Sequence, residues 1–414
     1  MSIASSLSAL AAAKNDIAEA ITAKGGTVGT GAGFTSFADA IATIPSGGAP
    51  ASVSPKDINF YDYDGRIVAA WTLSELADKE ELPPNPSHEG LTAQGWNWTL
   101  ADLKAENAPM NVGQMYITDD GKTRLYIRIS QYGRMTVPLH WYQSADSGVT
   151  IDWGDNSTPE TYTGTGDKNT THTYASVGDY VITLEVTSGT MRLGNGFSGN
   201  CVLGSTSTAG RVYTSMLKKV EIGNGVLDIG NYAFYTCSSL TSITIPNSVT
   251  NIGTNTFQNG YSLTSITIPS SVTNIGNPAF YTCYSLASIT IPKSVESISA
   301  NTFQNGYSLT SITIPSGVQS IGNNAFYACR SLASITIPSS VTNIGDSAFA
   351  ACRGVAHYYV YPTIPPVLGS TSVFDGIPSD CKIYVPDESV ESYKTATNWT
   401  TYASYIYPMS ERES

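Results

Sequence analysis

The chain has 414 residues, of which only 13% are charged, and its formal net charge is −12. This length allows two to four domains, and the scarcity of Lys and Arg argues against nucleic acid, whose phosphates demand clustered cations. No run of 18 apolar residues occurs, so no membrane-spanning helix is predicted. The first residues lack the basic and apolar segments of a secretory signal, which predicts a cytosolic chain unless a signal was removed.

Residues 1–45 are predicted to form short helices that attach the chain to a partner or to a second copy. Apolar side chains follow one another in steps of three and four, with Lys14 inside this seam and Gly25-Gly26 at its end. Two helices this short are marginal alone, so a self-packed hairpin and a seam for oligomerisation or docking both remain open. Residues 46–55, rich in Pro, Gly and Ser, predict a linker. The candidate docking residues are Ile3, Leu7, Leu10, Ile17 and Ile21.

Residues 56–109 predict a small α+β module. Strand-like segments on both sides of Asp64-Gly65 indicate a hairpin, and residues 72–79 indicate a helix. Trp96 and Trp98 are expected in the core of this module, with a platform for a ligand as the alternative.

Residues 110–188 have the pattern of an all-β domain, in which Tyr180 to Val186 alternate as a half-buried strand. The segment WGDNS at 153–157, paired with HTYASVGDY at 172–180, resembles a PKD domain. That resemblance implies an immunoglobulin-like sandwich of a kind common in surface and extracellular proteins, with aspartates that shape a turn. Asn156 stands where the family usually has Gly, and Asn also tolerates a positive φ.

Residues 217–354 repeat every 23 residues, and residues 189–216 are predicted to connect to this array and cap its start. A fixed period of this size predicts a solenoid in which each coil packs only on its neighbours. Each coil carries an L-x-x-I-x-I strand, and a single coil buries too little apolar surface to fold alone. The repeating residues are Leu217, Leu240, Leu263, Leu286, Leu309 and Leu332, with Phe234, Phe257, Phe280, Phe303, Phe326 and Phe349.

Four cysteines share one column of the repeat: Cys237, Cys283, Cys329 and Cys352. Residues two coils apart lie about 10 Å from each other, beyond the reach of a disulfide. Only Cys329 and Cys352, one coil apart, could bridge within this column. We therefore expect small buried thiols.

The segments ITIP, SVTNIG and AFYTCYSL, which recur within residues 217–354, closely resemble the BspA-like leucine-rich repeat. Residues 355–414, with Ile364-Pro365-Pro366 among them, look like the C-terminal cap of such arrays. The fold class expected is therefore multidomain and mainly β, a leucine-rich-repeat solenoid preceded by an Ig-like sandwich, an α+β module and N-terminal helices. The resemblance implies an adhesive protein, because the family occurs in bacterial surface proteins and phage tail proteins.

The variable positions of the repeat supply the candidate ligand-binding residues. A column of Tyr and Arg stands two residues before the repeat leucines, a second tyrosine set recurs every 46 residues, and threonines form a ladder on the strand face. Tyr adds contact area at low entropic cost, but these rings could also only cover the edges of the stack, and the threonines could simply favour strands. The candidates are Tyr261, Tyr284, Tyr307, Arg330 and Arg353, then Tyr235, Tyr281 and Tyr327, then Thr267, Thr290 and Thr313.

No motif for catalysis, metal binding or a cofactor occurs, so we expect no enzyme, no catalytic residue, no metal and no cofactor. A metal site between the histidines and aspartates of the PKD-like domain is a minor alternative. A hydrolase acting on wall polysaccharide would need a carboxylate pair. Asp62 and Asp64 are the only acids in a suitable aromatic setting, and their neighbouring turn explains them better.

The N-terminal segment favours one of two kinds of adhesin. AAAKNDIAEAITAKGG and FTSFADAIATIP resemble a segment of phage and prophage tail-associated proteins, as do NFYDYDGRIVAAW and GLTAQGWNWTLADLK. We therefore expect a non-enzymatic virion tail protein, assembled in the host cytoplasm, that forms a homo-oligomer and contacts other tail or baseplate proteins. Its solenoid is expected to bind a host-surface glycan or protein, without nucleic acid or membrane insertion. The alternative is a bacterial cell-surface adhesin of the BspA-like family.

Overall fold

A computed structural model describes residues 53–412, except 64, 107–108, 131–133, 145–147 and 195–198. The predicted N-terminal helices and most of the predicted linker lie outside the described residues, as do the candidate docking residues Ile3, Leu7, Leu10, Ile17 and Ile21. Residues from Ser54 onward form one compact unit. Within the described part of the chain, no helix is long and apolar enough to cross a bilayer.

The unit begins with a small α+β module of four strands and two helices. Its elements are β1 (Ile58–Tyr61), β2 (Ile67–Trp71), α3 (Leu73–Ala77), β3 (Leu91–Trp96), α4 (Leu100–Glu106) and β4 (Met110–Thr118). The predicted hairpin is confirmed, because β1 and β2 pair antiparallel. The predicted helix is confirmed as α3, which starts with a capping box formed by Thr72 and Glu75.

The tryptophans of this module lie in its core, as predicted. Trp96 is 8% exposed and Trp98 is 2% exposed. Phe60 of β1 packs edge-on against Trp96, with ring centroids 5.1 Å apart. These rings fill the space between sheet and helices, so neither tryptophan offers a free face as a ligand platform.

The predicted domain boundary at residue 110 is wrong. Strand β4 was assigned to the following sandwich, but it pairs parallel with β1 and antiparallel with β3 in a sheet of order β2-β1-β4-β3. The strand is buried at eight of its nine positions. It needs cover on both faces, and the module's own core supplies only one of them.

The next part is a two-sheet β sandwich that continues directly into the repeats. Its strands are β5 (Thr123–Ile129), β6 (Thr136–Gln143), β7 (Gly148–Asp152), β8 (Glu160–Thr163), β9 (Gly166–Thr173), β10 (Gly178–Ser188) and β11 (Met191–Leu193). The half-buried strand is confirmed, since Ile182 and Leu184 of β10 are buried while the alternating positions Val181, Thr183 and Glu185 are only partly buried. The immunoglobulin-like identity of the sandwich stays a prediction.

Both sheets of the sandwich run on into the solenoid, which changes the role predicted for residues 189–216. Strand β5 pairs with β12 (Leu217–Glu221), and β11 pairs with β13 (Val226–Ile229), so each sheet contains strands of both parts. A short helix, α5 (Arg211–Thr214), directly precedes β12. The sandwich and the repeats therefore share one hydrophobic core, and the sandwich itself covers the first coil.

The WGDNS segment forms the predicted turn. The Asp152 carboxylate accepts from the amide of Gly154 at 2.8 Å, and the Asp155 carboxylate accepts from the amide of Ser157 at 3.1 Å. His172 lies 2.7 Å from the second oxygen of Asp155, and its ring stacks on Trp153. No group of three potential metal ligands occurs among the described residues.

This turn predicts a loss of stability in acid. Burial raises the pKa of the Asp155 carboxyl, but the hydrogen bonds from Ser157 and His172 outweigh it and lower the pKa to about 2. A carboxyl whose pKa is depressed on folding stabilises above its unfolded value near 4, and the contribution disappears as the pH falls towards 2. We expect Asp155→Asn to lower the free energy of unfolding by roughly 2 kcal/mol at pH 7.

The measurement is urea denaturation of both proteins between pH 7 and pH 2. Between pH 4 and pH 2 the two curves should converge, because the wild-type carboxylate becomes protonated. A difference that stays constant down to pH 2 would contradict this account.

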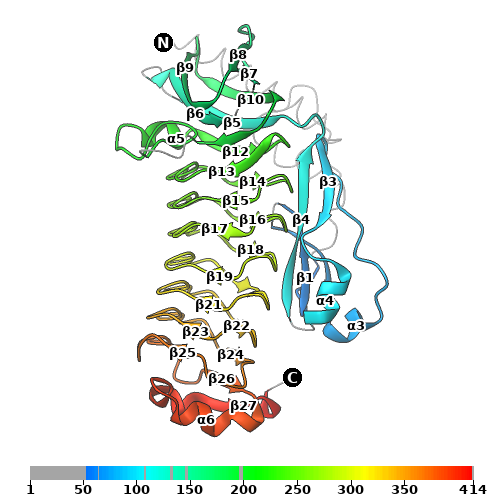
Figure 1. Ribbon diagram of the computed structural model, residues 1–414, viewed down its shortest axis with the longest axis vertical. Helices are drawn as coiled ribbons and strands as arrows, with labels where there is room; N and C mark the ends of the chain where they lie inside the picture. Colours follow the sequence, from blue (N-terminus) through cyan, green and yellow to red (C-terminus); the bar gives the residue numbers. More distant parts are fainter. Residues whose placement is uncertain are drawn as a thin grey trace, which may run out of the picture. The chain divides into compact units, whose positions relative to one another are not determined.

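The repeats form a solenoid with two columns of short parallel strands, as predicted from the 23-residue period (Figure 1). The register of the parallel strands confirms the 23-residue period, since Ile266 lies opposite Ile289 and Ile252 lies opposite Ile275. The first strand column comprises β14 (Ser242–Thr244), β16 (Ser265–Thr267), β18 (Ser288–Thr290), β20 (Ser311–Ile312) and β22 (Ser334–Ile337). The second strand column comprises β13, β15 (Asn251–Ile252), β17 (Asn274–Ile275), β19 (Ser297–Ile298), β21 (Ser320–Ile321), β23 (Asn343–Ile344) and β25 (Val367–Leu368).

A continuous stack of phenylalanine rings runs through the core of the solenoid, together with rows of Leu, Ile and Val side chains. Phe303, for example, lies parallel to Phe280 and Phe326, with centroid distances of 5.6 and 5.3 Å. The cysteine prediction is confirmed, because all four cysteines of the column are buried and free. Burial raises the pKa of the Cys283 thiol to about 12, so it stays protonated and donates to the carbonyl oxygen of Phe257.

Residues 355–412 extend the first strand column and then cover the open end of the solenoid. The strands continue in the order β22-β24-β26-β27. Tyr393 and Trp399, both fully buried, pack edge to face over the last coil. The elements are β24 (His357–Val360), β26 (Lys382–Val385), η3 (Asp387–Ser389), α6 (Val390–Thr395), η4 (Trp399–Tyr405), β27 (Ile406–Pro408) and η5 (Met409–Glu411).

Candidate binding surface

The α+β module covers the first strand column. Strand β4 lies beside β14, β16, β18 and β20, although these elements are far apart in the sequence (Figure 1). The amide of Asn111 donates to the Thr313 hydroxyl at 2.6 Å, and its side-chain amide donates to the Ser311 hydroxyl at 2.9 Å. The Asn97 side chain donates to the carbonyl oxygen of Ile268 at 3.3 Å. The contact therefore includes polar groups and runs along four coils.

The threonine ladder lies inside this contact. Thr267, Thr290 and Thr313 are 8%, 2% and 7% exposed. The prediction that they form a surface for an external ligand does not agree with this burial, and we remove them from the candidate site. Sequence analysis missed the contact, although Gly113 in the middle of a buried strand is a signal of close backbone approach.

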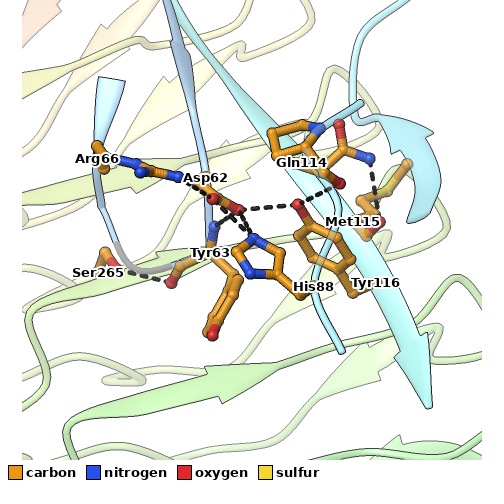
Figure 2. Close-up of polar contacts among 9 residues, drawn as sticks. Asp62, Tyr63, Arg66, His88, Gln114, Met115, Tyr116 and Ser265 are labelled. Atoms are coloured by element: carbon orange, nitrogen blue, oxygen red, sulfur yellow. Dashed lines mark hydrogen bonds and ion pairs between the residues drawn. The ribbon is translucent and has the colours of Figure 1, made fainter. Parts of the chain in front are cut away.

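A buried carboxylate holds the tip of the β1–β2 hairpin against the solenoid (Figure 2). The Asp62 side chain is fully buried, and it accepts from the Tyr116 hydroxyl at 2.9 Å and from Arg66 at 3.1 Å. His88 Nε2 lies 2.8 Å from the same carboxylate. The next residue, Tyr63, offers its carbonyl oxygen to the Ser265 hydroxyl of β16 at 2.9 Å. Asp62 thus fixes the loop that contacts the repeats.

This arrangement gives Asp62 a structural role. Besides Tyr116, Arg66 and His88, the amide of Tyr63 contacts the carboxylate, at 2.9 Å. These contacts hold the carboxylate within the module, away from the solvent. Asp64, the other member of the pair considered from the sequence, lies outside the described residues.

The Tyr/Arg column forms an exposed ladder along one edge of the solenoid. Tyr261 and Tyr284 are 40% and 37% exposed, while Tyr307 is half-buried. The three rings are stacked, with centroids 5.1 and 4.9 Å apart and planes within 9°. The guanidinium of Arg330 lies over the free face of Tyr307, 4.7 Å from its centroid. We call Tyr261, Tyr284, Tyr307 and Arg330 the tyrosine edge.

The backbone of each coil aims these side chains outward. Two residues before Tyr261, Tyr284 and Tyr307 the chain takes a positive φ, at Asn259, Thr282 and Asn305. The left-handed residue lies in the turn that follows each core phenylalanine, and the column position comes two residues later. Because every coil repeats this turn, the rings fall one above the other.

Stacking determines what the tyrosine edge presents to a partner. Each inner ring has a neighbour on both faces, so ring edges and hydroxyl groups face the solvent. Burial and the neighbouring tyrosines raise the pKa of the Tyr284 hydroxyl, which therefore stays protonated at neutral pH and can donate a hydrogen bond. The edge is a row of hydroxyl groups at a spacing of about 5 Å.

The other candidates extend this edge in part. Arg353 continues the column beyond Arg330 and is exposed. Tyr235, Tyr281 and Tyr327 are half-buried, and Tyr281 lies close enough to Tyr284 to influence its pKa. Tyr235 packs under the guanidinium of Arg211, with 5.6 Å to the ring centroid. The structure thus brings Tyr281 to the tyrosine edge and gives Tyr235 a partner of its own.

Comparison with known families agrees with the repeat architecture. Residues 212–309 match the BspA type leucine rich repeat region, in six copies. The sequence matches no curated protein.

Several crystal structures of bacterial proteins are similar to part of the chain. A leucine rich cell surface protein from Faecalibacterium prausnitzii A2-165 is 30% identical, with 42% of this chain and 56% of that chain covered and a TM-score of 0.35. The T. pallidum leucine rich repeat protein is 24% identical, with 42% and 86% covered and a TM-score of 0.27. A leucine-rich repeat protein from Bacteroides ovatus ATCC 8483 is 23% identical, with 47% and 67% covered and a TM-score of 0.27. The chain thus spans about half the length of the first of these proteins, and it contains a leucine-rich repeat region of the BspA type.

Proposed function

We propose that the protein is a non-enzymatic adhesin of the bacterial cell-surface kind, and that it binds a cell-surface glycan or protein through the tyrosine edge. The BspA-type repeat region supports this kind of protein. The observation that carries the proposal is the stacked ladder of Tyr261, Tyr284 and Tyr307. Tyr is enriched among residues that dominate binding energies, and stacking fixes these rings before a partner arrives.

The core of the solenoid does not need the tyrosine rings of the tyrosine edge to cover it. The phenylalanine rings inside the coils already fill the core, and Tyr261 and Tyr284 are among the few large hydrophobic side chains that remain exposed. A rigid row of exposed aromatic side chains on a soluble surface marks an interaction site.

The tail-protein interpretation stays a prediction. The residues that support it lie partly in 1–45, outside the described part of the chain, and partly in 59–71 and 90–104, whereas the family match covers only residues 212–309. Attachment to other tail proteins and homo-oligomerisation rest on residues 1–45 and are likewise predictions.

The proposal is tested by replacing the middle ring of the ladder. We expect Tyr284→Ala to weaken retention of the full chain on cells or on a glycan and matrix-protein array by roughly tenfold or more. Stability should change little, because Tyr284 is exposed and lies outside the phenylalanine stack. Tyr361→Ala, a half-buried tyrosine away from the edge, is the matched control. Equal retention of wild type and Tyr284→Ala would refute the role of the edge.

A further inference from the structure

A cationic hollow lies at the junction of the sandwich and the first coil. It has a volume of about 350 Å³, and its wall contains Arg128, Arg134 and Lys218 together with the hydroxyl groups of Ser130 and Ser215. We call this feature the cationic hollow. Three cations in one depression are unusual in a chain with a net charge of −12.

The charges of the hollow are only partly balanced. Arg128 forms a bidentate pair with Asp179, at 2.7 and 2.6 Å. No carboxylate among the described residues lies within ion-pair distance of Arg134 or Lys218. The hollow therefore keeps an excess of two positive charges, which attracts anions at short range.

A β-bulge places Lys218 at this position. Strand β12 pairs Leu217 with Ile127 and Lys219 with Tyr126, so Lys218 is the extra residue of the strand. Bulges of this kind redirect a side chain away from the regular alternation. Without the bulge, Lys218 would follow the pleat and the following side chains would change face.

The hollow stands at one end of the tyrosine edge. Ser215, Ser238 and Tyr261 occupy the same column, 23 residues apart, so the wall residue Ser215 lies two coils before the first ring. The Thr214 hydroxyl lies 3.0 Å from the carbonyl oxygen of Thr236 and 2.8 Å from that of Arg211, so α5 contacts the following coil along this edge. Five coils at about 4.8 Å each place Ser215 roughly 24 Å from Arg330.

Acidic side chains are missing from this stretch of the sequence. Between residues 230 and 345 Glu296 is the only carboxylate, and it directly precedes β19 of the second strand column. The cationic hollow, the hydroxyl groups of the column, the three stacked rings, Arg330 and the exposed Arg353 therefore follow one another along this side of the solenoid. Positive charge lies at both ends, and the single carboxylate of that stretch, Glu296, does not belong to the Tyr/Arg column.

We infer that the ligand is a linear acidic polysaccharide that lies along the tyrosine edge and places anionic groups in the cationic hollow and at Arg330. The inference rests on the proposed adhesive function and names the class of its ligand. The periodic row of tyrosine hydroxyl groups suits a chain of sugar hydroxyl groups. Nucleic acid fits less well, because its bases bind by stacking on free aromatic faces, and both faces of Tyr284 and one face of Tyr261 are occupied by neighbouring rings.

The test measures binding of the full chain to immobilised polygalacturonate and chondroitin sulfate, with neutral dextran and single-stranded DNA as further arms. Wild type should bind the two acidic polysaccharides above the neutral polymer and the DNA, and more weakly as salt rises. Arg134→Glu combined with Lys218→Glu should weaken this binding by roughly tenfold or more. Lys218→Gln alone should also weaken binding to the acidic polysaccharides. This variant tests the inference if the double variant does not fold. Lys394→Glu, a cap residue far from the hollow in sequence, is the matched charge control.

The outcomes separate this inference from the proposed function. If cell binding depends on Tyr284 but both acidic polysaccharides bind no better than dextran, the ligand class is wrong and the adhesive function stands. Equal binding of DNA, or equal loss with Lys394→Glu, would show unspecific attraction of polyanions and overturn the inference. If neither cell binding nor polysaccharide binding depends on Tyr284, both proposals fall.

Discussion

Phe303→Ala is expected to lower the free energy of unfolding by roughly 3–5 kcal/mol, which is the usual cost of removing a large buried ring. Phe303 is 1% exposed, and its ring contacts Phe280 of the preceding coil and Phe326 of the following coil. Replacement by Ala therefore removes two stacking contacts and leaves a cavity between three coils.

The repeat architecture makes this position sensitive. In a solenoid each coil is stabilised only by its neighbours, so a cavity in a central coil weakens the interfaces on both sides. The sulfhydryl of Cys329 also donates to the carbonyl oxygen of Phe303, which ties the same site to the next coil. We expect little relaxation around the cavity, because the columns of strands fix the spacing of the coils.

Urea denaturation followed by circular dichroism measures the effect. Gln319→Ala is the matched control in the neighbouring coil, because this side chain is exposed and its backbone bonds do not depend on it. The control should stay within about 0.5 kcal/mol of wild type. A loss below about 1 kcal/mol for Phe303→Ala would show that the ring stack contributes little to the solenoid.

The solenoid could be predicted from the sequence because its core residues recur every 23 residues. Ile266 and Ile289 recur at the same place in every coil, and the structure pairs them directly. The buried cysteines followed from the same period and from the spacing of strands. Local structure could also be predicted, as the helix at residues 72–79 and the WGDNS turn show.

The docking of the α+β module could not be predicted in the same way. Asn111 and Thr313 are 202 residues apart, and their hydrogen bond leaves no periodic trace in the sequence. The threonine ladder was interpreted as an exposed polar face. The sequence pattern of an outward-facing threonine is the same whether water or another strand covers the side chain. The boundary at residue 110 was misplaced for the same reason, since β4 has the composition of any buried strand.

The sequence predicted that the tyrosines of the tyrosine edge form a column, but it did not predict the orientation of their rings. The period placed Tyr261, Tyr284 and Tyr307 one above the other, and the structure shows that the rings stack. Sequence spacing says nothing about ring orientation, so it could not decide that edges and hydroxyl groups face outward. The cationic hollow was missed because its three cations come from two different segments, around Arg128 and around Lys218.

Gly113→Ala is expected to loosen the module from the repeats and to cost roughly 1–3 kcal/mol, the usual effect of overpacking. A Cβ at position 113 would lie 2.5 Å from atoms of Thr267 and Thr290, which is far inside van der Waals contact. Both threonines are buried and β-branched, so their side chains have little freedom to move aside. Gly178→Ala is the matched control, because the nearest atom to its Cβ is 3.5 Å away.

The cause can be isolated by removing the atoms that clash. In a chain that already carries Thr267→Ala and Thr290→Ala, the further change Gly113→Ala should cost much less, because the space is then free. The Thr290 hydroxyl has no hydrogen-bond partner among the described residues, so its removal sacrifices no bond. The double-mutant cycle thus measures the contact between β4 and the first strand column.

Hydrogen exchange shows whether the module has moved. The amide of Asn111 donates to the Thr313 hydroxyl across the contact, so it should exchange faster in Gly113→Ala and recover its protection in the rescued chain. Unchanged exchange at Asn111 together with a loss of stability would locate the effect inside the module instead. Faster exchange with cell binding intact would show that the module braces the first strand column, while the tyrosine edge binds on its own.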